Sequence, residues 1–267
     1  MTTIYRRSML LLPVLLLVMA APKTADATIV EFRTSLGDFQ VNLYDNLTPA
    51  TVDNFLEYVN SGAYTQSVVH RSAPNFVLQG GGFNIDMANL LQAITTIPAV
   101  TNEPELSNVR GTIAMAKLGG DPNSATSQWF FNTVDNASAL DDNNGGFTVF
   151  GEVIGDGMDV VNAIAGLPTF QFDSPFGELP LRDYSQNDFT TGVNPDDTNF
   201  VIISEVIIAD SDADSAAGLN PPANTAGSGI GGGGGGSSSG GGGGASGLLW
   251  LAGLLLMAWR RDPAFRG

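Results

Sequence analysis

The sequence predicts a mainly β domain with two helices, arranged as a β-barrel or a β-sandwich. Two runs of alternating apolar and polar residues, 28–34 and 39–44, flank Ser35-Leu36-Gly37-Asp38 and indicate a β-hairpin. The β-branched stretch 199–208 is typical of a closing strand. Between them, short apolar runs are separated by Gly, Asn, Asp and Pro, as expected for strands joined by turns, at 76–78, 112–116, 128–132 and 147–150.

Two segments have helical signatures. Thr48-Pro49 begins the first, because threonine is favoured at the N-cap and proline at the first helical position. Apolar residues then recur at helical spacing, at Val52, Phe55, Leu56 and Val59. Ser61-Gly62 ends this helix. A second, shorter helix is expected over 158–165.

Composition excludes several classes of function. The 267 residues include 27 acidic and 11 basic side chains, for a formal net charge of -16. So acidic a chain repels phosphate backbones, and no basic stripe offsets the charge, so we expect no nucleic-acid partner. There is no cysteine and only one histidine, His70, which leaves too few ligands for a zinc site. We therefore predict no metal and no cofactor.

Residues 1–27 have the three parts of a secretory signal peptide. They are a basic start with Arg6-Arg7, an apolar run over 9–21 and an Ala-Asp-Ala cleavage site that ends at Ala27. The apolar run is shorter than the ~20 residues that a membrane span needs. We predict cleavage after Ala27; cleavage after Ala20 or Ala21, or retention as an anchor, are the alternatives.

The C-terminal part is also non-globular in composition. Residues 210–247 are acidic and then rich in Gly and Ser, which is typical of a flexible linker. Residues 248–267 combine a short apolar run, 248–259, with Arg260-Arg261. Glycine linker, apolar helix and arginines together resemble the GlyGly-CTERM class of bacterial sorting tails, which implies cutting by a rhomboid-like protease. A simple C-terminal membrane anchor is the alternative.

This organisation predicts one folded domain, 28–209, between an N-terminal signal peptide and a C-terminal sorting tail. The export machinery and the sorting protease are the partners that these two terminal segments imply. The protein is expected to be exported to the periplasm or the cell surface of a Gram-negative-like bacterium, with 248–259 as a transient inner-membrane anchor.

Four motifs follow one another in the predicted domain. The first runs from Val69 to Phe83 and contains His-Arg, Pro-Asn-Phe and Gln-Gly-Gly. The others are Arg-Gly-Thr-Ile-Ala-Met-Ala at 110–116, Asn-Ser-Ala-Thr-Ser-Gln-Trp-Phe-Phe-Asn at 123–132, and Phe-Thr-Val-Phe-Gly-Glu-Val at 147–153 with Gly-Met shortly after. Together they resemble the cyclophilin-type peptidyl-prolyl cis-trans isomerases. The resemblance implies a monomeric, closed eight-stranded antiparallel β-barrel, capped by two α-helices, that acts on proline-containing polypeptides.

The resemblance also implies which residues act. Rotation about a prolyl bond is opposed by amide resonance, a barrier of about 18–20 kcal/mol. A catalyst must stabilise the twisted amide with a donor to its nitrogen and an apolar slot for the ring. Arg71 resembles the family's catalytic arginine, and its rigid fork of donors suits that task. Gln79 and Phe76 complete the implied catalytic set. The implied substrate-binding residues are Val77, Ala116, Gln128, Phe130, Leu140 and Phe147.

The remaining residues are interpreted more simply. His70 is expected to be structural, and Lys117 replaces a polar residue that holds substrate through its main chain. Ala139 stands where the family often has Trp or Phe, which implies weak binding of cyclosporin-type inhibitors. The stretch 168–197 is longer and more acidic than the usual loop, and its role is open.

The predicted function is an active isomerase for exported proteins. The alternatives are a non-catalytic module that binds proline-containing segments at the cell surface, and a barrel serving only as a surface scaffold.

Overall fold

The computed structural model describes residues 28–88, 90–211 and 219–226. The predicted signal peptide, the Gly/Ser tract and the apolar run 248–259 lie outside the described residues. Within those three described ranges, no helix is both long enough and apolar enough to cross a membrane.

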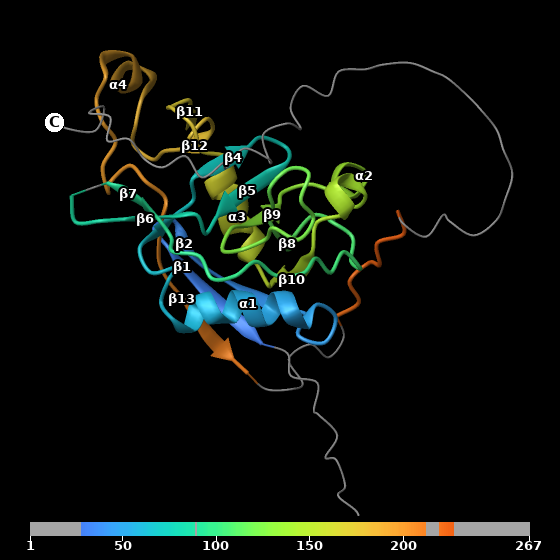
Figure 1. The fold of residues 1–267 in the computed structure, drawn as a ribbon. Coiled ribbons are helices and arrows are strands. Elements are labelled where there is room, and N and C mark those ends of the chain that lie inside the picture. Colours follow the sequence, from blue (N-terminus) through green and yellow to red (C-terminus); the bar gives the residue numbers. More distant parts are fainter. Residues whose placement is uncertain (1–27, 89, 212–218, 227–267) are drawn as a thin grey trace, which may run out of the picture.

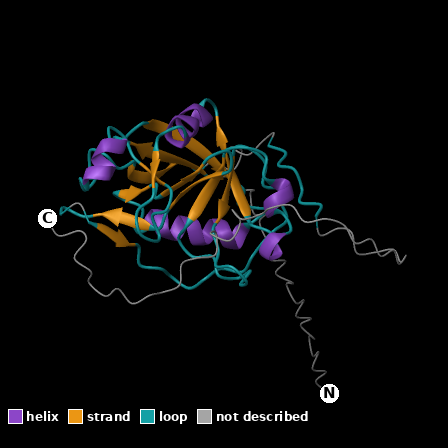
Figure 2. Ribbon diagram, turned by 90° about the horizontal axis from the view of Figure 1, so that it is seen from above, coloured by secondary structure: helices purple, strands orange, loops and turns teal. Residues whose placement is uncertain are grey.

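Most strands belong to one curled antiparallel sheet, with helices on both sides of it (Figures 1 and 2). Its eleven strands are β1 Ile29–Thr34, β2 Gly37–Leu43, β3 Ser67–Val68, β4 Arg71–Ala73, β5 Val77–Gly80, β6 Phe83–Ile85, β7 Leu91–Ala93, β8 Thr112–Met115, β9 Trp129–Asn132, β10 Val149–Ile154 and β13 Ile202–Asp210. A two-stranded sheet consists of β11 Thr169–Phe170 and β12 Leu179–Pro180. The helices are α1 Pro49–Asn60, α2 Ala137–Leu140, the 3₁₀ turn η1 Asn143–Gly145, α3 Gly157–Ala165 and α4 Gln186–Thr191.

The strand order of the large sheet is β4-β5-β9-β8-β10-β2-β1-β13-β3-β6-β7. The predicted mainly β architecture with antiparallel pairing is confirmed. The closed eight-stranded barrel is not confirmed, because the order has two ends, β4 and β7, and eleven strands. Part of the higher count arises where the chain bends at Val69 and His70, so that one segment supplies both β3 and β4 to different parts of the sheet.

The predicted hairpin and closing strand are both present. β1 pairs with β2 over six residues, from Ile29 opposite Asn42 to Thr34 opposite Gly37. Gly37 has a φ of 125° at the turn, a conformation that side chains rarely adopt. β13 pairs with the other edge of β1, where Phe32 lies opposite Val206. The four short apolar runs expected to be strands coincide, within a few residues, with β5, β8, β9 and β10.

Both predicted helices are present as α1 and α3, but the cap of α1 differs from the expectation. Thr48 occupies the N-cap position without a side-chain capping bond, and its buried hydroxyl has no partner among the described residues. The Glu103 carboxylate accepts instead from the Thr51 amide at 2.8 Å, the Thr51 hydroxyl at 2.7 Å and the Ala50 amide at 3.2 Å. A carboxylate is favoured there because helix N-termini carry partial positive charge.

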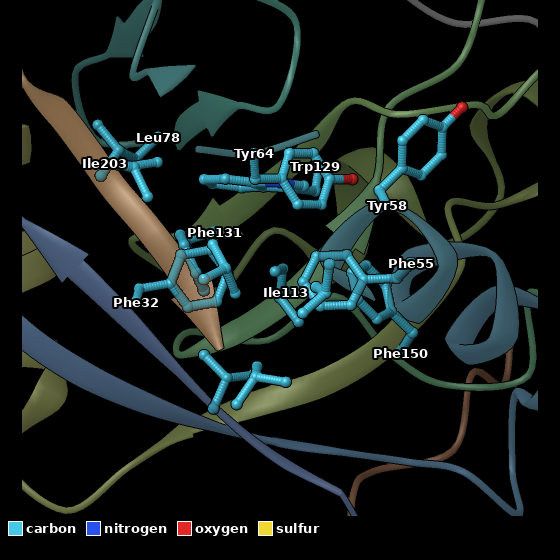
Figure 3. Packing of buried hydrophobic residues seen from close by; sticks show 14 of the residues in the cluster. Phe32, Phe55, Tyr58, Tyr64, Leu78, Ile113, Trp129, Phe131, Phe150 and Ile203 are labelled. Atoms are coloured by element: carbon cyan, nitrogen blue, oxygen red, sulfur yellow. The ribbon is translucent and has the colours of Figure 1, made fainter. Parts of the chain in front are cut away.

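The main core lies between α1, α3 and the sheet, and aromatic rings dominate it (Figure 3). The Phe32 ring stacks on Phe39 at 5.0 Å between centroids and meets Trp129 and Phe131 edge-on at 5.2 and 5.6 Å. Helix α1 adds Phe55, which is fully buried. Burying each such side chain contributes roughly 1.5–3 kcal/mol, so this core holds β5, β8 and β9 in place.

The Gln-Gly-Gly motif is explained by the approach of Trp129 to the backbone. A Cβ atom on Gly80 would lie 2.5 Å from Cη2 of Trp129, and one on Gly81 would lie 2.5 Å from the Ser127 carbonyl oxygen. Gly81 also has a φ of 74°. A side chain at either position would therefore displace the Trp129 indole or the Ser127 main chain, or else shift the backbone next to Gln79.

Candidate active site

Strand register places two of the predicted catalytic residues, Arg71 and Gln79, in one row with Phe130 and Ala114 across four strands. Arg71 on β4 lies opposite Gln79 on β5, Gln79 lies opposite Phe130 on β9, and Phe130 lies opposite Ala114 on β8. Directly opposite residues of antiparallel strands project to the same face. The donor Arg71 is therefore on the same face of the sheet as the aromatic ring of Phe130.

Alternation along these strands separates this face from the main core. Leu78, Phe131 and Ile113 are the neighbours of that row on the same strands, and they project into the main core. The opposite face packs into a second apolar cluster, which we call the Phe130 cluster. Its buried members are Tyr44, Ala73, Val77, Leu106, Ala114, Ala116, Phe130, Leu140, Phe147 and Val149. Phe76, Ala139 and Leu219 are partly buried against it.

A chain of polar contacts runs along the edge of this face. Arg71 Nη1 donates to Gln79 Oε1 at 3.4 Å, and Gln79 Nε2 donates to Gln128 Oε1 at 2.9 Å. The main chain of Gln128 accepts from the Ala116 amide at 2.9 Å. The three polar residues singled out from the sequence thus contact one another in series.

The predicted apolar residues come together in the Phe130 cluster. Val77, Phe130 and Leu140 are fully buried, and Phe147 is 3% exposed. The rings of Phe130 and Phe147 meet edge-on at 5.8 Å. Phe76 is the predicted aromatic residue that keeps partial exposure. All nine predicted site residues therefore belong either to the polar chain or to this cluster, and the two groups meet where Gln79 lies opposite Phe130.

Residues 29–185, more than half of the chain, match the family model described as cyclophilin type peptidyl-prolyl cis-trans isomerase/CLD. The chain belongs to this family. It is 45% identical over 148 residues to a peptidyl-prolyl cis-trans isomerase of Acinetobacter baylyi, covering 53% of this chain and 74% of that protein. It is 42% identical over 146 residues to peptidyl-prolyl cis-trans isomerase B of Escherichia coli, covering 52% and 85%. Isomerisation of peptidyl-prolyl bonds is therefore its activity.

A solved structure supports the fold of this cyclophilin. The crystal structure of a Cryptosporidium parvum cyclophilin-type isomerase aligns with a TM-score of 0.50 and 24% sequence identity. The alignment covers 70% of this chain and 99% of that one. The family match ends at residue 185 of the 267, so β13 lies beyond it. This strand completes the pairing of β1.

Lys117 holds the turn that precedes Phe147. Its side chain is 5% exposed, and its ammonium donates to the carbonyl of Asn144 at 2.9 Å and to that of Gly146. The ammonium also lies 4.8 Å from the centroid of the Phe147 ring. Burial lowers the pKa of Lys117 to about 8. From the sequence, only the main chain is expected to act at this position. The side-chain contacts depend on the turn 144–146, whose three residues all have positive φ.

A buried polar network lies next to the Phe130 cluster and fixes parts of it. The Asp141 carboxylate accepts from the Ser107 hydroxyl at 2.6 Å and from the Asn108 amide at 2.8 Å. Asn136 continues the network by donating to the Phe76 carbonyl at 2.9 Å. The main chain of Phe76 and the side chain of Asp141, the residue after Leu140, are thereby fixed. Sequence reasoning missed these groups because a single Asp or Asn has no distinctive spacing.

The one histidine of the sequence lies beside the polar chain and within the fold. His70 is 2% exposed, and its ring meets Phe83 edge-on at 5.2 Å. Burial, and then the charge of Arg71, lower the pKa of His70 to about 4. The imidazole is therefore neutral at neutral pH. Among residues 28–88, 90–211 and 219–226, no group of three or more His, Asp or Glu side chains is placed to hold a metal ion.

Proposed function

We propose that Arg71 of this cyclophilin stabilises the twisted prolyl amide while the proline ring rests against the Phe130 cluster. The observation that carries the proposal is the cross-strand row, in which Arg71, Gln79 and Phe130 are directly opposite neighbours on β4, β5 and β9. That row sets a cationic donor beside an apolar surface. Both elements are needed to stabilise a rotated Xaa-Pro bond.

The chemistry requires no covalent step. As the amide rotates, resonance is lost and the prolyl nitrogen gains a lone pair that accepts a hydrogen bond. A guanidinium has five N–H groups and stays protonated at every relevant pH. In the described residues Arg71 uses Nε for Glu178 and one Nη1 hydrogen for Gln79, so three N–H groups remain for substrate. A donor that binds the twisted amide better than the planar one lowers the barrier.

The apolar and polar neighbours have separate roles in this proposal. Phe76, with its partly exposed ring, contacts the proline, and Val77, Phe130, Leu140 and Phe147 support that surface from within the cluster. Gln79 orients the guanidinium. Gln128 and Ala116, whose main chains are hydrogen-bonded to each other, form the edge of the site. The peptide backbone on either side of the substrate proline lies along this edge.

Substitution of Arg71 tests this mechanism. Purified full-length protein is compared with Arg71→Ala in a cis-to-trans assay on a short Xaa-Pro peptide. Loss of a donor aimed at the transition state lowers kcat by about 10²-fold with little change in KM. Arg33→Ala is the matched control, because Arg33 pairs with Glu31 and Glu205 on β1 and β13, away from the row. Undiminished acceleration by Arg71→Ala would refute the proposal.

We further propose that the enzyme works on exported proteins. The three-part signal at 1–27 and the resemblance of 248–267 to a sorting tail support export by the general secretory route and processing by a rhomboid-like protease. On this proposal the mature protein is monomeric, and its clients are proline-containing polypeptides of the periplasm or cell surface. N-terminal sequencing of protein from the envelope is expected to start at Thr28; an intact Met1 in all fractions would rule out cleavage.

A further inference from the structure

Glu178 lies in the loop 168–197 and makes direct contact with Arg71. The Arg71 Nε atom donates to Glu178 Oε2 at 2.8 Å, and the Arg71 side chain is only 12% exposed. We propose that Glu178 is a positioning residue that fixes the guanidinium for catalysis, an inference that rests on the proposed role of Arg71. This positioning role gives the long acidic loop 168–197 a specific part in the reaction.

The backbone of Glu178 is fixed next to Arg71. The carbonyl of Glu178 accepts from the amide of Ser72, the residue after Arg71, at 2.8 Å. The following residue, Leu179, is 2% exposed and pairs with Phe170 between β12 and β11. Glu178 is therefore held through its main chain on one side and by a buried neighbour on the other. Its carboxylate reaches Arg71 from an anchored position, unlike an ordinary surface side chain.

The two distances at the guanidinium show which contact restrains it more. The bond from Arg71 to Gln79 measures 3.4 Å, near the outer limit for a hydrogen bond, whereas the bond to Glu178 measures 2.8 Å and joins opposite charges. Charge-assisted bonds are roughly twice as strong as neutral ones. Glu178 is thus the main restraint on the guanidinium, and Gln79 is the weaker second one.

Contacts at Nε and Nη1 orient the planar group and leave the rest of the fork free. Because guanidinium is rigid, two contacts on it fix the plane, and the remaining N–H groups then have one direction. Without Glu178 the side chain regains rotamer freedom that must be lost again in each catalytic event. The expected defect is in kcat, since Glu178 itself makes no proposed contact with substrate.

A double-mutant cycle on the full-length protein tests the inference. Glu178→Ala is expected to lower kcat about fivefold with KM changed less than twofold. In the Arg71→Ala background the same substitution is expected to have no further effect, because a residue that acts only through Arg71 has nothing left to position. Glu205→Ala is the matched control: it also removes a partly exposed partner of an arginine, and should leave kcat unchanged.

Different outcomes would refute the positioning role of Glu178 and the proposed role of Arg71. An unchanged kcat in Glu178→Ala, or an equal loss with and without Arg71, overturns the positioning role of Glu178 alone. Full activity of Arg71→Ala overturns the proposed mechanism and this inference with it. If Glu178→Ala does not fold, as judged by circular dichroism, the isosteric Glu178→Gln enters the same cycle with the same expected non-additivity.

Discussion

Lowering the pH is expected to destabilise this cyclophilin through its one histidine. His70 is nearly inaccessible to water, and burial together with the nearby Arg71 lowers its pKa to about 4. In the unfolded chain a histidine has a pKa of about 6.5. The two states therefore bind different numbers of protons between these two pKa values.

The sign and size of the effect follow from linkage. Below pH 6.5 the unfolded chain binds a proton at His70 that the folded domain does not, so the unfolded state gains stability as the pH falls. The contribution of a neutral His70 to folding is complete above pH 6.5 and is lost as the pH falls toward 4. Between pH 7 and pH 5 this group alone lowers the free energy of unfolding by about 2 kcal/mol.

Urea unfolding at pH 7 and pH 5 measures this effect, with His70→Gln as the reference. The 27 acidic residues also respond to pH, but they do so in both proteins. The difference between wild type and variant at the two pH values isolates His70. A wild-type protein that loses no more stability than His70→Gln on acidification would show that the imidazole is not buried in its neutral form.

Two further substitutions test contacts around the site. Lys117→Met leaves the Asn144 carbonyl without its donor and the Gly146 carbonyl with only the Asn102 side-chain amide. It is expected to lower the free energy of unfolding by about 1–3 kcal/mol at pH 7, which urea unfolding measures; an unchanged midpoint would contradict it. Asn224→Ala removes two hydrogen bonds to main-chain carbonyls of 104 and 141 and should speed amide exchange at Ser107, which donates to the Pro222 carbonyl; unchanged exchange would mean that this segment is not held by Asn224.

Local motifs were the part of the site that the sequence could predict. The residues of the row lie in the four motifs, as do Val77, Ala116 and Phe147 of the Phe130 cluster; an example is the run from Val69 to Phe83, which contains Gln79-Gly80-Gly81. Their supporting partners are remote in sequence. Glu178 reaches Arg71 across 107 positions, and Glu103 reaches Thr51 across 52. No spacing rule links such pairs, so they become visible only in the folded chain.

The segment 219–226 shows a second limit of prediction from composition. It lies in the stretch expected to be a linker, yet Ala223 forms a bridge with Leu106, and the Asn224 amide donates to the Glu105 carbonyl at 2.8 Å. These are largely backbone contacts, which leave little signature in side-chain pattern. Figure 1 shows this segment, coloured orange-red, as a separate stretch beyond the end of β13.

Burial on both faces explains why strands β5, β8 and β9 look like plain apolar runs. Each residue of β5, β8 and β9 is buried, so these strands lack the alternation that identified the β1–β2 hairpin. The two faces nevertheless have different tasks, because one joins the main core and the other forms the Phe130 cluster. Substitutions at Phe131 should therefore act mainly on stability, whereas Phe130, one residue earlier, combines packing with support of the site. The Phe130 cluster can therefore vary, as at Ala139 of α2, which packs against it, while the main core is kept.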